Sequence, residues 1–190
     1  MKQIILSLVL ACMLVSCNNE TSLQEYYVEK QEDREFLSLD LPISTLISAN
    51  SSLDSEQKRV LETIRKVNLL AYPIKDGQGE SFEQEKLEIE TILQDEKYES
   101  LMRFGRSGKG AQFYLVGDED AIDEFVVYGN DEERGFMIAR VLGEDMKVNE
   151  LYDLFESLDG DDITEIPGLG SFLESTVATP IHEETPDTIQ

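Results

Sequence analysis

One thiol near the start of the chain is placed where it could take part in covalent chemistry. Cys17 follows an apolar run from Ile4 to Val15 and precedes a polar stretch. A thiol is a much stronger nucleophile at neutral pH than a hydroxyl, so cysteine suits alkylation at this position. The other cysteine, Cys12, lies inside the apolar run. We therefore predict no disulfide, thiol catalysis or cysteine metal site after residue 17.

The segment before Cys17 has the layout of a secretory signal. Lys2 gives a short positive start, the apolar run follows, and the small residue Ser16 precedes the cysteine. A helix of about a dozen residues spans roughly 18 Å, which is too short for the ~30 Å hydrocarbon core of a membrane. We predict that residues 1–16 are a signal peptide. The kinds of segment that fit are a lipoprotein signal, favoured by the residues around Cys17, a plain secretory signal and an uncleaved anchor.

Leu14-Val15-Ser16-Cys17 resembles the lipobox of bacterial lipoproteins, with leucine at −3, a small residue at −1 and cysteine at +1. The resemblance implies that Cys17 carries diacylglycerol and that the chain is cut between Ser16 and Cys17. Asn18, rather than Asp, at +2 implies sorting to the outer membrane. We therefore expect a cell-envelope protein that is held at a membrane through the lipid on Cys17.

The composition excludes one class of partner and leaves two interpretations of the charge. The chain has 40 Asp and Glu against 16 Lys and Arg, a net charge of −24. Nucleic-acid binding needs Lys and Arg to neutralise phosphates, so we predict no nucleic-acid partner. The acidity provides either solubility or a docking face for a basic partner or divalent cations.

A glycine-rich segment, residues 105–110, invites comparison with phosphate-binding loops. That motif requires a glycine where this chain has Arg103, and Ser or Thr where it has Gly110. The flanking segments also alternate like strands, so no helix N-terminus is available to hold a phosphate. The pattern favours a hairpin loop.

The remaining polar motifs do not match known sites. Residues 159–162 and 118–120 are acidic, but the fifth position of a calcium loop would be Ile163 or Ile122. The single histidine, His182, lies in a proline-flanked tail, where no packed catalytic or zinc site is expected. We predict no catalytic, cofactor-binding or metal residues and no cofactor.

The periodicity of the chain predicts an α+β fold. We expect a mostly antiparallel sheet of five to six strands with helices mainly on one face. Asp54 with Gln57, and Ser81 with Gln84, have the spacing of capping boxes that begin helices. The expected strands are 35–41, 67–74, 98–104, 111–116, 122–128 and 135–142, and the expected helices are 54–66, 81–97 and 146–158, with short helical turns over 43–49.

These elements divide the chain into four parts. Residues 1–16 form the signal peptide, residues 17–34 carry the lipidated Cys17 and an acidic tether, and residues 35–160 form a single domain. Residues 161–190 form an acidic, largely disordered tail. The order of elements from Phe36 to Leu158 resembles small Bacteroidetes lipoproteins of a domain-of-unknown-function family. That resemblance implies a fold and a location, and no activity.

Three functional hypotheses follow. The first is a non-enzymatic interaction module that binds a protein partner in the envelope through a sheet edge or an aromatic strand face. The alternative is a small-ligand-binding protein, which requires a closed pocket of several hundred Å³. A carboxylate-dependent hydrolase is the third and requires two buried, facing acids. Aromatic side chains that could form either the core or the contact face are Phe113, Tyr114, Phe125, Tyr128 and Phe136.

Overall fold

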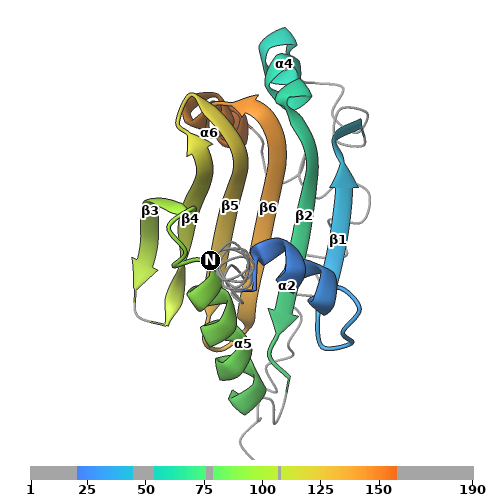
Figure 1. The fold of residues 1–190 in the computed structure, drawn as a ribbon, viewed down its shortest axis with the longest axis vertical. Helices are drawn as coiled ribbons and strands as arrows, with labels where there is room; N and C mark the ends of the chain where they lie inside the picture. The colour runs from blue at the N-terminus through green and yellow to red at the C-terminus, as the bar shows by residue number, and fades with distance from the viewer. Residues whose placement is uncertain (1–20, 45–53, 76–78, 107, 158–190) are drawn as a thin grey trace, which may run out of the picture.

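The computed structural model describes residues 21–44, 54–75, 79–106 and 108–157, with side chains of the last helix described as far as Leu154. Six antiparallel strands form one sheet in the order β1-β2-β6-β5-β4-β3 (Figure 1), which confirms the predicted fold class. The strands are β1 (Leu37–Pro42), β2 (Ile64–Pro73), β3 (Glu99–Arg106), β4 (Lys109–Asp118), β5 (Ala121–Asp131) and β6 (Gly135–Met146). The described helices are α2 (Leu23–Lys30), α4 (Ser55–Thr63), α5 (Gly79–Ile92) and α6 (Val148–Ser157).

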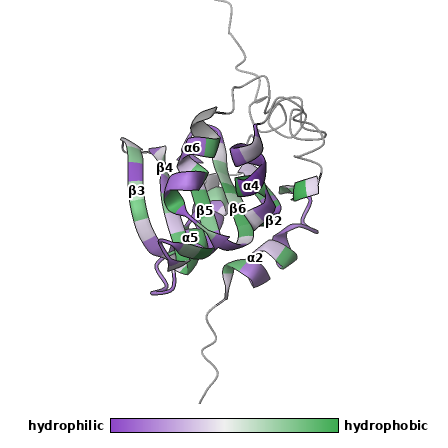
Figure 2. Ribbon diagram, turned by 90° about the horizontal axis from the view of Figure 1, so that it is seen from above, coloured by the Kyte–Doolittle hydropathy of each residue, from purple (hydrophilic) through white to green (hydrophobic). Residues whose placement is uncertain are grey.

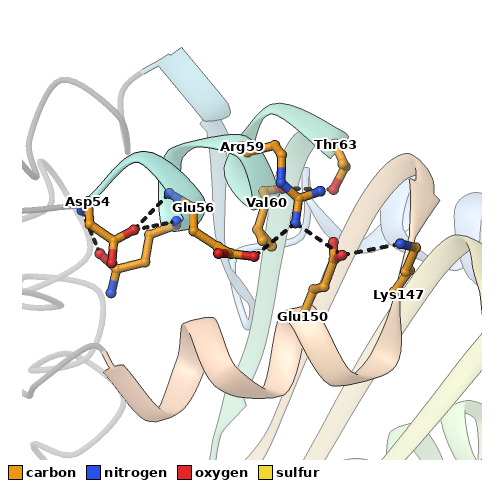
Figure 3. A network of polar contacts seen from close by, with 8 residues as sticks. Asp54, Glu56, Arg59, Val60, Thr63, Lys147 and Glu150 are labelled. Atoms are coloured by element: carbon orange, nitrogen blue, oxygen red, sulfur yellow. Dashed lines mark hydrogen bonds and ion pairs between the residues drawn. The ribbon is translucent and has the colours of Figure 1, made fainter.

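Helix α4 begins where the sequence predicted and ends earlier. The Asp54 carboxylate accepts hydrogen bonds from the backbone N–H groups of Glu56 and Gln57, both at 2.8 Å, and the Gln57 side chain accepts from the Asp54 N–H (Figure 3). The helix was expected to reach residue 66, but β2 starts at Ile64. Pairing of β2 with β6 requires an extended backbone there, so the sheet outweighs the helical spacing of the apolar residues.

The second predicted capping box does not form the start of its helix. Helix α5 begins at Gly79, so Ser81 lies within its first turn. Its apolar stripe is as expected, with Phe82, Ile89 and Ile92 buried.

Helix α2 lies within the segment, residues 17–34, that was predicted to be an acidic tether; residues 17–20 are outside the described part of the chain. Leu23 and Tyr26 are almost completely buried, and Lys30 forms a 2.7 Å ion pair with Glu85 of α5. The Ser22 hydroxyl caps the helix by accepting from the Glu25 N–H. The folded domain therefore begins near residue 22, because a few buried side chains outweigh the polar composition of this segment.

Both faces of the sheet carry helices, whereas the sequence predicted helices mainly on one face. Val126 and Tyr128 belong to the core under α2 and α5, and Phe125 and Val127 belong to the core under α4 and α6. Successive residues of a strand point to opposite faces, so the two helix pairs lie on opposite sides of the sheet (Figure 2).

The predicted aromatic residues are divided between these two cores. On the α2–α5 side, Phe136 stacks on Tyr72 with ring centroids 5.7 Å apart. Tyr114 and Tyr128 lie in the same core, and Phe113 and Phe125 lie on the other side. Their role as core residues is therefore confirmed, with Phe113 only partly buried.

A surface ion network joins α4 to α6. Arg59 donates to Glu150 at 3.1 Å, and Lys147 donates to the same carboxylate at 3.2 Å (Figure 3). The hydrogen bond from Arg59 lowers the pKa of Glu150 below its ordinary value. The network fixes the two helices at one end of the sheet.

Candidate functional site

Strand β3 forms one edge of the sheet, and its outer side has no partner strand in the described part of the chain. It is the most exposed of the strands, since every residue except Leu101 is exposed. Leu101 sits where the register with β4 shifts, between Ser100 and Met102. An edge strand presents a row of unpaired backbone donors and acceptors, which can pair with another chain.

One side of β3 is apolar and accessible. Met102 and Phe104 keep 41% and 59% of their surface exposed. The Phe104 ring meets Phe113 of β4 edge-on, with centroids 5.7 Å apart, and Phe113 lies 6.1 Å from Phe125 of β5. The exposed apolar side of the edge is therefore continuous with the core under α4 and α6.

The other side of β3 is polar and faces a groove. Arg103 donates to the Gln112 side-chain oxygen at 2.5 Å, and the Tyr114 hydroxyl donates to the same oxygen at 2.9 Å. The groove, of about 470 Å³, lies between this hairpin and α5, and Lys86 and Glu90 are among the residues that line it. The edge thus separates a side that carries Met102 and Phe104 from a polar side that carries Arg103.

The glycines of residues 105–110 are explained by the hairpin itself. Gly105 has φ +110° and pairs in register with Gly110. A Cβ on Gly105 would collide with the Lys109 carbonyl oxygen, and one on Gly110 would collide with the Phe104 carbonyl oxygen. As predicted, this segment joins two strands, although the strands continue to Arg106 and restart at Lys109.

The local charge of the β3–β4 hairpin was not singled out from the sequence. Residues 100–117 contain three Arg or Lys and no Asp or Glu, within a chain of net charge −24. Lys109 is engaged by Asp131 at 2.7 Å, and this contact lowers the pKa of the Asp131 carboxyl. Arg103 and Arg106 form no ion pair within the described residues. We call residues 99–110 the basic hairpin.

The buried polar residues do not provide the facing acids that a carboxylate hydrolase requires. Glu124 is the one buried acid in the described ranges, and it faces Arg140, at 2.7 and 2.8 Å. Arg140 also donates to Gln24 of α2. This arrangement is a buried ion pair that connects β5, β6 and α2.

Three hollows on the described surface differ from the closed pocket that the small-ligand hypothesis requires. Besides the groove at the basic hairpin, two others have volumes of about 310 and 660 Å³. All three open to solvent. The smaller is lined by the ends of β2, β5 and β6, and the larger by outward residues of α5 and the segment after it.

Several predicted site residues lie outside the described part of the chain: Ser16, Cys17, residues 159–162 and His182. The acidic residues 118–120 lie at the turn between β4 and β5 and are exposed. Among described residues, no three or more His, Cys, Asp or Glu are grouped to hold a metal ion. Nor does any helix within those ranges have the length and apolar character needed to cross a membrane.

Fold and edge together define a small α+β domain with one antiparallel sheet and one open, basic edge. The chain belongs to the family described as a domain of unknown function, DUF4252, which matches residues 26–154. That range starts within α2 and ends within α6, so the match covers the whole sheet and part of both helices. Neither the curated proteins nor the solved structures gave a match.

Proposed function

We propose that this protein is a lipid-anchored lipoprotein of the cell envelope that acts as a non-enzymatic interaction module. The lipobox-like Leu14-Val15-Ser16-Cys17 supports attachment to the outer membrane through lipid on Cys17. The resemblance to small Bacteroidetes lipoproteins supports the same location. The partner is a protein of the envelope, bound through strand β3.

The open edge is the observation that carries this proposal. Soluble proteins normally shorten, cover or bend their edge strands, because an exposed apolar edge promotes unwanted pairing. Here an eight-residue edge strand is exposed and carries Met102 and Phe104 on its surface. An edge of this kind is suited to strand addition by a partner, in which main-chain hydrogen bonds supply affinity.

Metabolic labelling tests the anchor. Labelled palmitate is expected to enter the wild-type protein and to be absent from a Cys17→Ala variant. Equal incorporation into both proteins would contradict lipidation of Cys17.

Partner capture tests the interaction. The native envelope is cross-linked, and tagged wild-type, Cys17→Ala, Phe104→Asp and Leu87→Asp proteins are purified for mass spectrometry. Leu87 is a matched control because it is an exposed apolar residue on α5, away from the edge. We expect a partner that co-purifies with the wild-type and Leu87→Asp proteins. It should be absent from the Cys17→Ala and Phe104→Asp samples. A partner retained by Phe104→Asp would remove the edge from the proposal.

A further inference from the structure

We infer that the partner presents an extended, acidic segment that adds to the sheet as a seventh strand along β3. This inference rests on the proposed function and specifies the chemistry of its partner. The unpaired backbone of β3 favours a polypeptide over a lipid surface, because an extended chain can satisfy the alternating N–H and C=O groups of an edge.

The charge of the basic hairpin selects the sign of the partner. Residues 100–117 contain three basic residues and no acid; Lys109 is paired with Asp131, and Arg103 and Arg106 have no ion pair within the described residues. Glu90 and Glu132 also line the groove beside the hairpin, together with Lys86. The chain as a whole is strongly acidic, so an acidic segment is repelled by most of the molecule and attracted at this hairpin. Such a field directs the partner to β3 and orients it there.

The same charges disfavour a second copy of this chain as the occupant. Pairing of two β3 strands would bring Arg103 and Arg106 of one copy, which lie on opposite sides of the strand and form no ion pair within the described residues, close to the same residues of the other copy. Like charges facing one another across a sheet destabilise the pairing. Basic side chains on an edge therefore block self-association and leave it open to a strand of opposite charge.

The two sides of β3 predict the pattern of the partner strand. Met102 and Phe104 are on the side of Phe113, and Arg103 is on the side of Gln112 and α5. A strand laid along this edge places alternate residues on the two sides. The partner segment is thus expected to alternate apolar residues, next to Phe104, with Asp or Glu, next to Arg103.

A designed peptide tests the inference on the chain from Asn18 onward, which contains every described residue. The probe is an acetylated, amidated seven-residue peptide in which valine and glutamate alternate. The control peptide has lysine in place of glutamate. Binding is followed by fluorescence anisotropy, and hydrogen exchange reports which backbone amides become protected. We expect the glutamate peptide to bind and to protect β3 amides, and the lysine peptide to bind at least about tenfold more weakly.

Charge reversal provides the matched variants. Arg103→Glu with Arg106→Glu is expected to reverse the preference, so that the lysine peptide binds more tightly than the glutamate peptide. Arg65→Glu with Lys66→Glu makes the same charge change at exposed positions of β2, remote from β3, and should leave the preference unchanged. Thermal unfolding confirms that each variant is folded.

Three results would overturn the inference. They are equal binding of both peptides, binding of the glutamate peptide without protection of β3, and binding of phosphatidylglycerol vesicles that depends on Arg103 and Arg106. The last result would assign the hairpin to an anionic membrane. The failure of this inference is distinguishable from that of the proposed function. If Phe104-dependent capture finds a partner and the glutamate peptide does not bind, only the inference fails, and the edge remains a binding site for a segment of other chemistry.

Discussion

The two edge strands of the sheet, β1 and β3, differ in length, in exposure and in their side-chain contacts. At β1 the strand is six residues long and finishes with Pro42, which has no N–H to offer a neighbour. Asp40 accepts from the Tyr27 hydroxyl at 2.7 Å and from the Asn68 side chain. At β3 the strand is eight residues long, is exposed except at Leu101, and pairs with β4 alone in the described part of the chain.

Both edge strands lack a partner strand on their outer side in the described part of the chain, but β1 is tied to a helix by a side-chain hydrogen bond. Helix α2 supplies the Tyr27 hydroxyl to β1, and it is also joined to the centre of the sheet by Gln24 and Arg140. No helix in the described ranges provides comparable contacts to β3. A side-chain hydrogen bond from a helix is therefore described for β1 and not for β3, and the longer, more exposed edge with a distinct charge is the expected location of a partner.

The largest expected effect concerns the ion pair that connects α2 to the sheet. Arg140→Leu leaves Glu124 buried without a partner, and we expect the free energy of unfolding to fall by about 3–5 kcal/mol. Urea denaturation measures the change. Arg140→Leu with Glu124→Leu should recover most of the loss, because no buried charge then lacks a partner. The comparison between the two edges requires that Arg103→Leu has little effect on stability; a loss as large as that of Arg140→Leu would contradict it.

Aromatic truncation contrasts the open edge with the core. Phe136→Ala removes a buried ring that stacks on Tyr72 and is expected to cost about 3–5 kcal/mol. Phe104→Ala removes a mostly exposed ring and is expected to cost about 1 kcal/mol or less. Thermal or urea unfolding of the two variants gives the comparison directly, and similar losses would mean that β3 is part of the core.

A smaller effect is expected at the β1 edge. Tyr27→Phe removes the hydroxyl donated to Asp40, and the net loss for such a hydrogen bond is about 1 kcal/mol. Hydrogen exchange should become faster in β1 and stay unchanged in β3. If hydrogen exchange becomes equally faster in both strands, the Tyr27–Asp40 hydrogen bond does not stabilise β1 specifically.

The smallest expected effect tests which basic side chains of the basic hairpin form ion pairs. Lys109→Met should raise the pKa of Asp131 toward its ordinary value, as measured by NMR titration of the carboxyl carbon. Because the folded-state pKa of Asp131 is lowered, its contribution to stability is present above the unfolded pKa and is lost as the pH falls through the folded value. The stability difference between wild type and Lys109→Met should therefore vanish in acid. An unchanged Asp131 pKa would mean that Lys109 is as free as Arg106.

Local patterns predicted much of the fold. The capping box at Asp54, the period-two segments and the hairpin glycines depend on neighbouring residues, which the sequence displays. The start of β2 at Ile64 and the burial of α2 could not be found in this way. Both depend on contacts with residues far along the chain, such as Gly143 for Ile64 and Glu85 for Lys30.

The candidate site was only partly predictable for a similar reason. Exposed aromatic residues and a sheet edge were expected, but which strand lies at the edge follows from the pairing order. The acid-free run over residues 100–117 is visible in the sequence, and it marks the strand that the structure places at the open edge. A run without acidic residues, within a very acidic chain, is thus a useful local signal.

Cross-linking at the two edges tests the central claim most directly. A photo-reactive amino acid is placed at Met102 or Phe104 on β3, and at Ser38 or Leu39 on β1, in the native envelope. The account predicts a specific protein cross-link from the β3 positions and none from the β1 positions. Cross-links from β1 alone, or equally from both edges, would contradict the claim that β3 is the open binding edge.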